Sequence, residues 1–111
     1  MPTKFDDFID AVLKGVPALA KQLFADLETQ ATEDTKAFLD KSRTDLQRWT
    51  ESFANGKLTK GELTDLTQAK IAVAEIHALT QAGVTLVMLD NFRKALINLI
   101  IDSAFAVFLP S

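Results

Sequence analysis

Cysteine is absent from the 111 residues, which excludes disulfides, thiolate metal sites and cysteine nucleophiles. Positive charge is also scarce: 12 Lys and Arg stand against 15 Asp and Glu, and the formal net charge is -3. Because affinity for nucleic acid comes mostly from Lys and Arg that neutralise phosphates, we expect no nucleic-acid partner. The first residues lack the basic start and apolar run of a secretory signal, so we expect a cytoplasmic protein.

Strand signatures and chain breakers are rare as well. There is no sustained alternation of apolar and polar residues, and only four glycines and three prolines interrupt the chain. Hydrophobic residues make up 48% and charged residues 24%, which is typical of a globular protein. The apolar residues recur at helical spacing, so we predict a single all-α domain over residues 1–111.

The predicted first helix is short and covers residues 3–15. Thr3 can accept hydrogen bonds from its free amides, and Asp6 and Asp7 lie where the helix dipole favours negative charge. Gly15 followed by Pro17 predicts a stop and a restart. The apolar face of this helix consists of Phe5, Phe8, Ile9, Val12 and Leu13.

The predicted second helix covers residues 17–54, because no breaker lies inside this range. Such a helix would be roughly 57 Å long at about 1.5 Å per residue. Its apolar stripe repeats with an eleven-residue rhythm, which is typical of a nearly straight helix. The stripe consists of Leu27, Ala31, Thr35, Phe38, Ser42, Leu46, Trp49 and Phe53.

A sharp turn follows, and then a third helix. Asn55 and Gly56 form a stop, and Thr59 with Glu62 has the spacing of a capping box. A stop and a start so close together predict a long antiparallel hairpin, with the third helix over residues 60–108. Gly83 either ends that helix or lies inside it, and we favour the second because no turn-forming residue adjoins it. The expected stripe is Leu63, Leu66, Ala69, Val73, Ile76 and Leu79.

The hairpin also predicts which parts of the chain meet. Reflecting the chain about residue 57 brings Phe5 opposite Leu109 and Phe8 near Ala106. The two most apolar ends of the chain would thus lie at one end of the molecule.

Residues 84–109 are apolar around most of the helix, and one hairpin partner covers only one side. Only a narrow polar strip remains, at Asn91, Lys94, Asn98 and Asp102. We expect a second copy of the chain to supply the missing cover, so that a helical bundle forms by self-association, with a dimer favoured. A different protein, or a membrane surface or lipid, is the alternative cover. The candidate interface residues are Phe92, Arg93, Leu96, Ile97, Ile100, Ile101, Asp102, Phe105 and Phe108.

Residues typical of catalysis or of metal binding are not combined in any convincing pattern. His77 is the only histidine, and we interpret it as exposed, with Glu75 pointing elsewhere. Glu33 and Asp34 are expected on a charged outer face. Arg93 either forms an ion pair with Asp90 within its own helix or meets a carboxylate of another chain.

We therefore predict no catalytic, cofactor or metal site. The sequence favours a non-enzymatic structural, adaptor or regulatory protein that acts through protein–protein contacts. The alternative is a protein that associates with lipid or a membrane surface through residues 84–109. A weaker alternative is an enzyme or ligand carrier with a site formed only between subunits.

Overall fold

The computed structural model describes residues 3–109. Over that range the chain forms six α-helices and no strand, so the all-α class predicted from the sequence is confirmed. The helices are α1 (Lys4–Phe24), α2 (Glu28–Lys41), α3 (Arg43–Ala54), α4 (Lys60–Ala72), α5 (His77–Gln81) and α6 (Leu86–Phe108).

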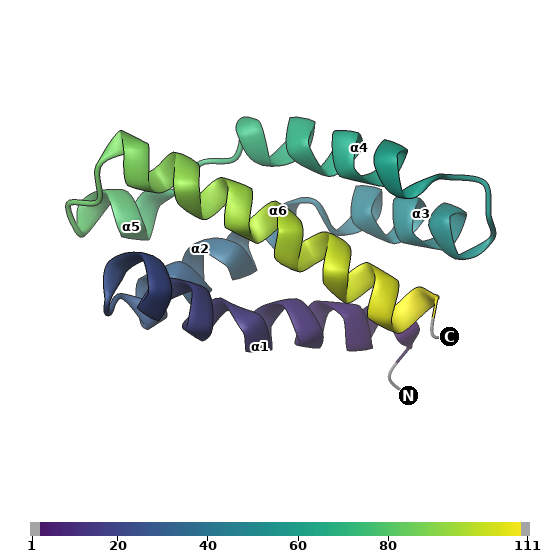
Figure 1. Cartoon of the computed structure of the whole chain (residues 1–111), viewed down its shortest axis with the longest axis horizontal. Coiled ribbons are helices and arrows are strands. Elements are labelled where there is room, and N and C mark those ends of the chain that lie inside the picture. The colour runs from purple at the N-terminus through teal and green to yellow at the C-terminus, as the bar shows by residue number, and fades with distance from the viewer. Residues whose placement is uncertain (1–2, 110–111) are drawn as a thin grey trace.

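The helices make four passes along one axis (Figure 1). α1 is the first pass, α2 and α3 together form the second, α4 and α5 form the third, and α6 is the last. Consecutive passes run in opposite directions, as in an up-and-down helical bundle. The described residues measure 41 × 27 × 23 Å along their principal axes.

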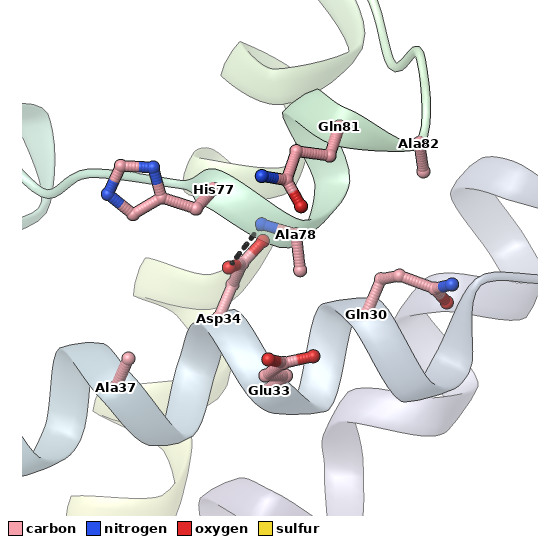
Figure 2. Close-up of a pocket in the computed structure, with 8 residues that line it drawn as sticks. All are labelled: Gln30, Glu33, Asp34, Ala37, His77, Ala78, Gln81 and Ala82. Carbon is pink, nitrogen blue, oxygen red and sulfur yellow. Dashed lines mark hydrogen bonds between the residues drawn. The ribbon is translucent and has the colours of Figure 1, made fainter.

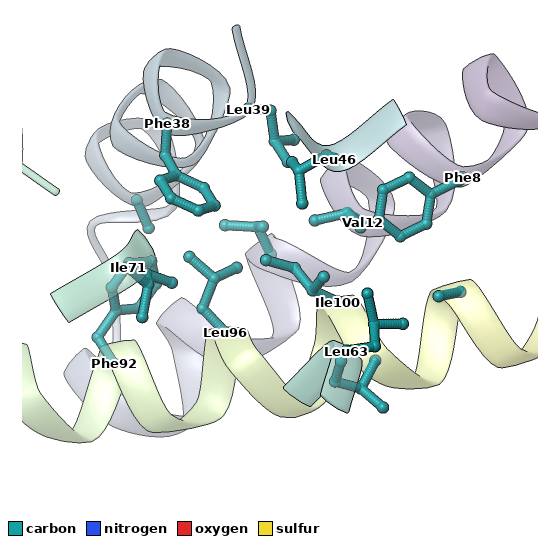
Figure 3. Close-up of a cluster of buried hydrophobic side chains, with 14 of the residues drawn as sticks. Phe8, Val12, Phe38, Leu39, Leu46, Leu63, Ile71, Phe92, Leu96 and Ile100 are labelled. Atoms are coloured by element: carbon teal, nitrogen blue, oxygen red, sulfur yellow. The ribbon is translucent and has the colours of Figure 1, made fainter. Parts of the chain in front are cut away.

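α6 lies against three of the other helices. It packs against α1 on one side and against α4 and α3 on the other. Its large apolar side chains meet those of α1 to α4 in one core, part of which Figure 3 shows. The α6 side chains in that core are Leu89, Phe92, Leu96, Ile100, Ile101 and Phe108.

The predicted stop at Gly15 and Pro17 is wrong, because α1 continues to Phe24. Its buried positions recur every three or four residues beyond the expected stop, from Val12 to Val16 and Ala20. A proline inside a helix removes a hydrogen bond and costs about 3 kcal/mol. The continued burial of this face against α6 and α2 offsets that cost.

The second predicted helix is also wrong in its bounds. The chain turns at residues 25–27, where Ala25 and Leu27 take left-handed backbone conformations with φ of 68° and 69°. A second break at Ser42 separates α2 from α3. No glycine or proline marks either break, so neither break has a local signal in the sequence. The longest dimension is therefore 41 Å, well short of the length of one unbroken helix.

The apolar stripe predicted for this segment is nevertheless confirmed. From Ala31 to Phe53 every member of the stripe is buried except Trp49, which is partly buried against the core. Thr35 is tolerated there because its hydroxyl donates a 2.8 Å hydrogen bond to the carbonyl of Ala31. The breaks thus change the direction of the helix without changing which face is buried.

The turn between α3 and α4 forms as the sequence predicts. Gly56 takes a φ of 75°, and Thr59 and Glu62 form both hydrogen bonds of a capping box, at 2.9 and 3.1 Å. The hydrogen bond from the Thr59 amide holds the pKa of the Glu62 carboxyl below its usual value. α3 and α4 then lie side by side and run in opposite directions (Figure 1).

The third predicted helix is interrupted twice. α4 ends at Ala72, and α5 ends before Gly83, which has a φ of 91°. Gly83 therefore terminates a helix, contrary to our expectation. The core stripe of α4 is also different: Leu63 and Ile71 are buried, whereas Val73 is 79% exposed.

The predicted meeting of the two chain ends occurs in spite of these extra turns. The rings of Phe8 and Phe108 lie 5.9 Å apart, and those of Phe24 and Phe92 lie 6.0 Å apart. These pairs fit a reflection of the chain about residue 58, close to the predicted residue 57. The register survives because the second and third passes are of similar length, so that α6 returns along α1.

Gly15 lies where α1 packs closely against Leu99 of α6. A Cβ atom at this position would lie 2.5 Å from Leu99 Cδ1, so a larger residue forces the Leu99 side chain to move. We expect Gly15→Ala to destabilise the wild type by about 1 kcal/mol, because displacing Leu99 outweighs the gain in helix propensity. In a Leu99→Ala background the same change should stabilise the protein by up to about 1 kcal/mol. Urea unfolding of the four proteins measures this coupling, and equal effects of Gly15→Ala in both backgrounds would refute it.

Candidate functional site at the α4–α5 connection

Residues 73–76 connect α4 to α5, and a buried carboxylate on α2 holds the start of α5. Asp34 is only 6% exposed. Its Oδ1 accepts a hydrogen bond of 2.9 Å from the amide of Ala78 (Figure 2), and its Oδ2 accepts one of 2.8 Å from the amide of Leu79. A carboxylate at this place accepts hydrogen bonds from amides that have no acceptor within the short helix.

The sequence did not predict this contact. Glu33 is exposed as expected, but the expectation that Asp34 lies on the same outer face is wrong. Asp34 and Ala78 are 44 residues apart, so only the folded arrangement of α2 and α5 brings them together.

A second polar anchor comes from α6. Arg93 Nη2 donates a hydrogen bond of 3.1 Å to the carbonyl of Ala74, in the middle of the connection. Its Nη1 lies 3.7 Å from Asp90 Oδ1, which is a loose ion pair. The buried Nε has no hydrogen-bond partner among the residues that the structure describes. The guanidinium is thus only partly satisfied by the residues that the structure describes.

His77 is exposed, as the sequence predicts. The expectation that Glu75 points elsewhere is wrong, because His77 Nε2 lies 2.8 Å from Glu75 Oε2. The reason is the backbone: Ile76 has φ of −119° and ψ of 90°, so these residues are extended, and side chains two positions apart lie on one side. Both side chains are largely exposed, so the pair contributes little to stability.

Three shallow hollows surround the connection, and His77 borders all of them. One of about 480 Å³ lies between α2 and α5 (Figure 2), where the Asp34 carboxylate points toward α5. A second, of about 280 Å³, lies between α2 and the end of α4. The third, of about 440 Å³, is bordered by Leu86, Leu89 and Arg93 of α6.

The polar groups around these hollows do not form a recognisable catalytic arrangement. Both oxygens of Asp34 already accept hydrogen bonds, and within residues 3–109 the one polar side chain paired with the His77 ring is Glu75. Within residues 3–109, no three His, Asp or Glu side chains are grouped so that they could hold a metal ion.

Exposed apolar side chains distinguish this region. Val73 is 79% exposed, Leu86 80% and Val87 70%, which are the highest values among the large hydrophobic residues of the described chain. Val73 and Leu86 border two hollows that share the connection, and Val87 follows Leu86 in the first turn of α6. We call these three residues the junction patch.

The interface residues predicted from the sequence are separated by the fold. Five of them are buried inside the chain, which places them in the core: Phe92, Leu96, Ile100, Ile101 and Phe108. The chain's own helices therefore supply the cover that we expected from a second copy. Arg93 and Ile97 are partly buried, whereas Asp102 and Phe105 are exposed.

The polar strip predicted on the last helix is confirmed, since all four of its residues are exposed. It separates two exposed apolar ends of α6: Leu86 and Val87 at the start, and Phe105 with Leu109 at the end. Phe105 rests on the ring of Phe53 at 5.6 Å. None of the helices between residues 3 and 109 has the length and apolar character needed to cross a membrane.

Comparison with known proteins adds no relative: no family model, no curated protein and no solved structure matches this chain.

The two hydrogen bonds of Asp34 generate a stability prediction. Replacement by alanine leaves the amides of Ala78 and Leu79 buried without this acceptor, and we expect a loss of about 2–4 kcal/mol in the free energy of unfolding. Faster hydrogen exchange at these two amides should accompany it. Glu33→Ala is the matched control, since it removes an exposed carboxylate from the adjacent position and should change stability by less than about 0.5 kcal/mol. Equal effects of the two substitutions in urea unfolding would contradict this role of Asp34.

Proposed function

We propose that the chain is a non-enzymatic structural or adaptor protein that works through protein–protein contact, with a second copy of itself as the partner. The contact surface in this proposal is the junction patch and the adjoining first half of α6. The observation that supports it is the exposure of Val73, Leu86 and Val87, of which the first two border hollows around the α4–α5 connection.

The energetics favour a contact of moderate strength. Complete burial of an aliphatic side chain contributes about 1.5–3 kcal/mol, so the three residues together contribute roughly 4–9 kcal/mol before the entropic cost of association. Exposed apolar patches often mark such contact sites on soluble proteins. Self-association is thus retained from the sequence interpretation, but the surface is different.

Lipid association is less well supported by the same geometry. A helix that lies on a membrane needs a continuous apolar face. The exposed apolar residues of α6 are at its two ends, and between them lie Asn91, Lys94 and Asn98. A partner that covers one end of the helix fits this pattern better than a flat apolar surface.

Light scattering after size-exclusion chromatography tests the proposal on the full chain over a range of concentrations. We expect the mass to rise above the 12.2 kDa of one chain as the concentration approaches about 1 mM. Val87→Lys should return the mass to that of one chain, because a charge would have to be buried in the contact.

Leu109→Lys provides the control, since it places the same charge on an exposed apolar position at the far end of α6. It should leave the concentration dependence unchanged. A mass of one chain for the wild type at every concentration, or an equal effect of both substitutions, would refute the proposal.

A further inference from the structure

One side of α6 carries a pattern that is complementary to itself. Leu86, Asp90, Arg93 and Ile97 follow one another at spacings of four, three and four residues, which places them in a single row along the helix. Read in either direction, the row has an apolar residue at each end and two opposite charges in the middle.

The row is largely exposed at Leu86 and Asp90 and partly covered at Arg93 and Ile97. Leu86 is 80% exposed, and the side chains of Asp90 and Arg93 are 70% and 23% exposed. Ile97 is partly buried at the edge of the core. The row also begins within the junction patch, so the two surfaces are continuous.

The charges in this row are poorly satisfied within one chain. Arg93 and Asp90 approach no closer than 3.7 Å, and Asp90 is mostly in water. Arg93 holds the carbonyl of Ala74 with one nitrogen, while its buried Nε has no partner within residues 3–109. A partly buried guanidinium gains most from a carboxylate that meets it at normal hydrogen-bond distance.

From this we propose that two copies of the chain pair through α6 in antiparallel orientation, about a two-fold axis beside the peptide bond between Asn91 and Phe92. Asp90 then faces Arg93 of the partner subunit, and Leu86 faces Ile97 of the partner subunit. One two-fold axis produces both pairings, because the midpoint between residues 86 and 97 along the helix is also the midpoint between residues 90 and 93. Two-fold symmetry forms each contact twice, as in other isologous dimers.

This inference rests on the proposed self-association and adds to it a defined partner surface and orientation. Val87, which follows Leu86 in the first turn of α6, would help to exclude water from the charge pairs. A contact of about three helical turns is at the small end of protein interfaces, so the dimer is expected to dissociate readily.

The inference is tested with Asp90→Lys, which replaces two attractive contacts of the dimer by two repulsive ones. We expect the dissociation constant measured by sedimentation equilibrium to rise by about tenfold or more. Asp102→Lys makes the same charge change at an exposed position of α6 outside the row, and it should leave the dissociation constant within about twofold of the wild type.

Mixing two variants separates this geometry from a general loss of folding. Arg93→Glu alone should also dissociate the dimer, because it places two carboxylates opposite each other. An equimolar mixture of D90K and R93E should associate again, since each subunit then presents the charge that the other lacks. Circular dichroism on each variant confirms that the helices are retained.

The outcomes distinguish the two proposals. If the wild type associates and Val87→Lys disrupts it, but D90K has no effect or the mixture stays dissociated, the antiparallel α6 pairing is wrong while the proposed function stands. If the wild type does not associate, both are wrong. Restored association in the mixture, with D102K unchanged, supports the pairing.

Discussion

The burial of α6 is the constraint on which the rest of the structure depends. Six of its large apolar side chains are in the core, and together they contribute about 9–18 kcal/mol to folding, more than the whole net stability of many small domains. A helix that is apolar on most sides needs neighbours on more than one side. The chain supplies them by turning back at residues 25–27 and again at Gly83, so that α1 and α4 flank α6.

Features that arise from local sequence were predictable. Three such features depend on residues within a few turns of each other. They are the capping box of Thr59 and Glu62, the turn at Gly56, and the stripe through Phe38 and Leu46. The breaks at Ala25 and Leu27 were not predictable, because ordinary residues adopt left-handed conformations there only to let α2 pack against α1. Their strain, on the order of 1 kcal/mol each, is small beside the burial that it permits.

The candidate site was predictable only in fragments. Arg93 could be singled out because a charge in an apolar segment needs a partner, and the structure shows that its own chain satisfies it incompletely. The role of Asp34 and the exposure of Val73 could not be derived, since both depend on where the third pass bends. Ile100, predicted at an interface, is buried within the chain for the same reason: the sequence shows which side chains are apolar, but not how often the chain returns to cover them.

The antiparallel packing of α1 and α6 also determines how the molecule would respond to tension. The first turn of α1 and the last turn of α6 lie at the same end of the bundle (Figure 1), where Phe8 meets Phe108. A force that separates these two ends would act across the helix pair and break its contacts one turn at a time. Contacts broken in succession resist less than contacts loaded together, so the bundle should open like a zipper from this end. The junction patch lies toward the opposite end and would be the last part of the α6 surface to be disturbed.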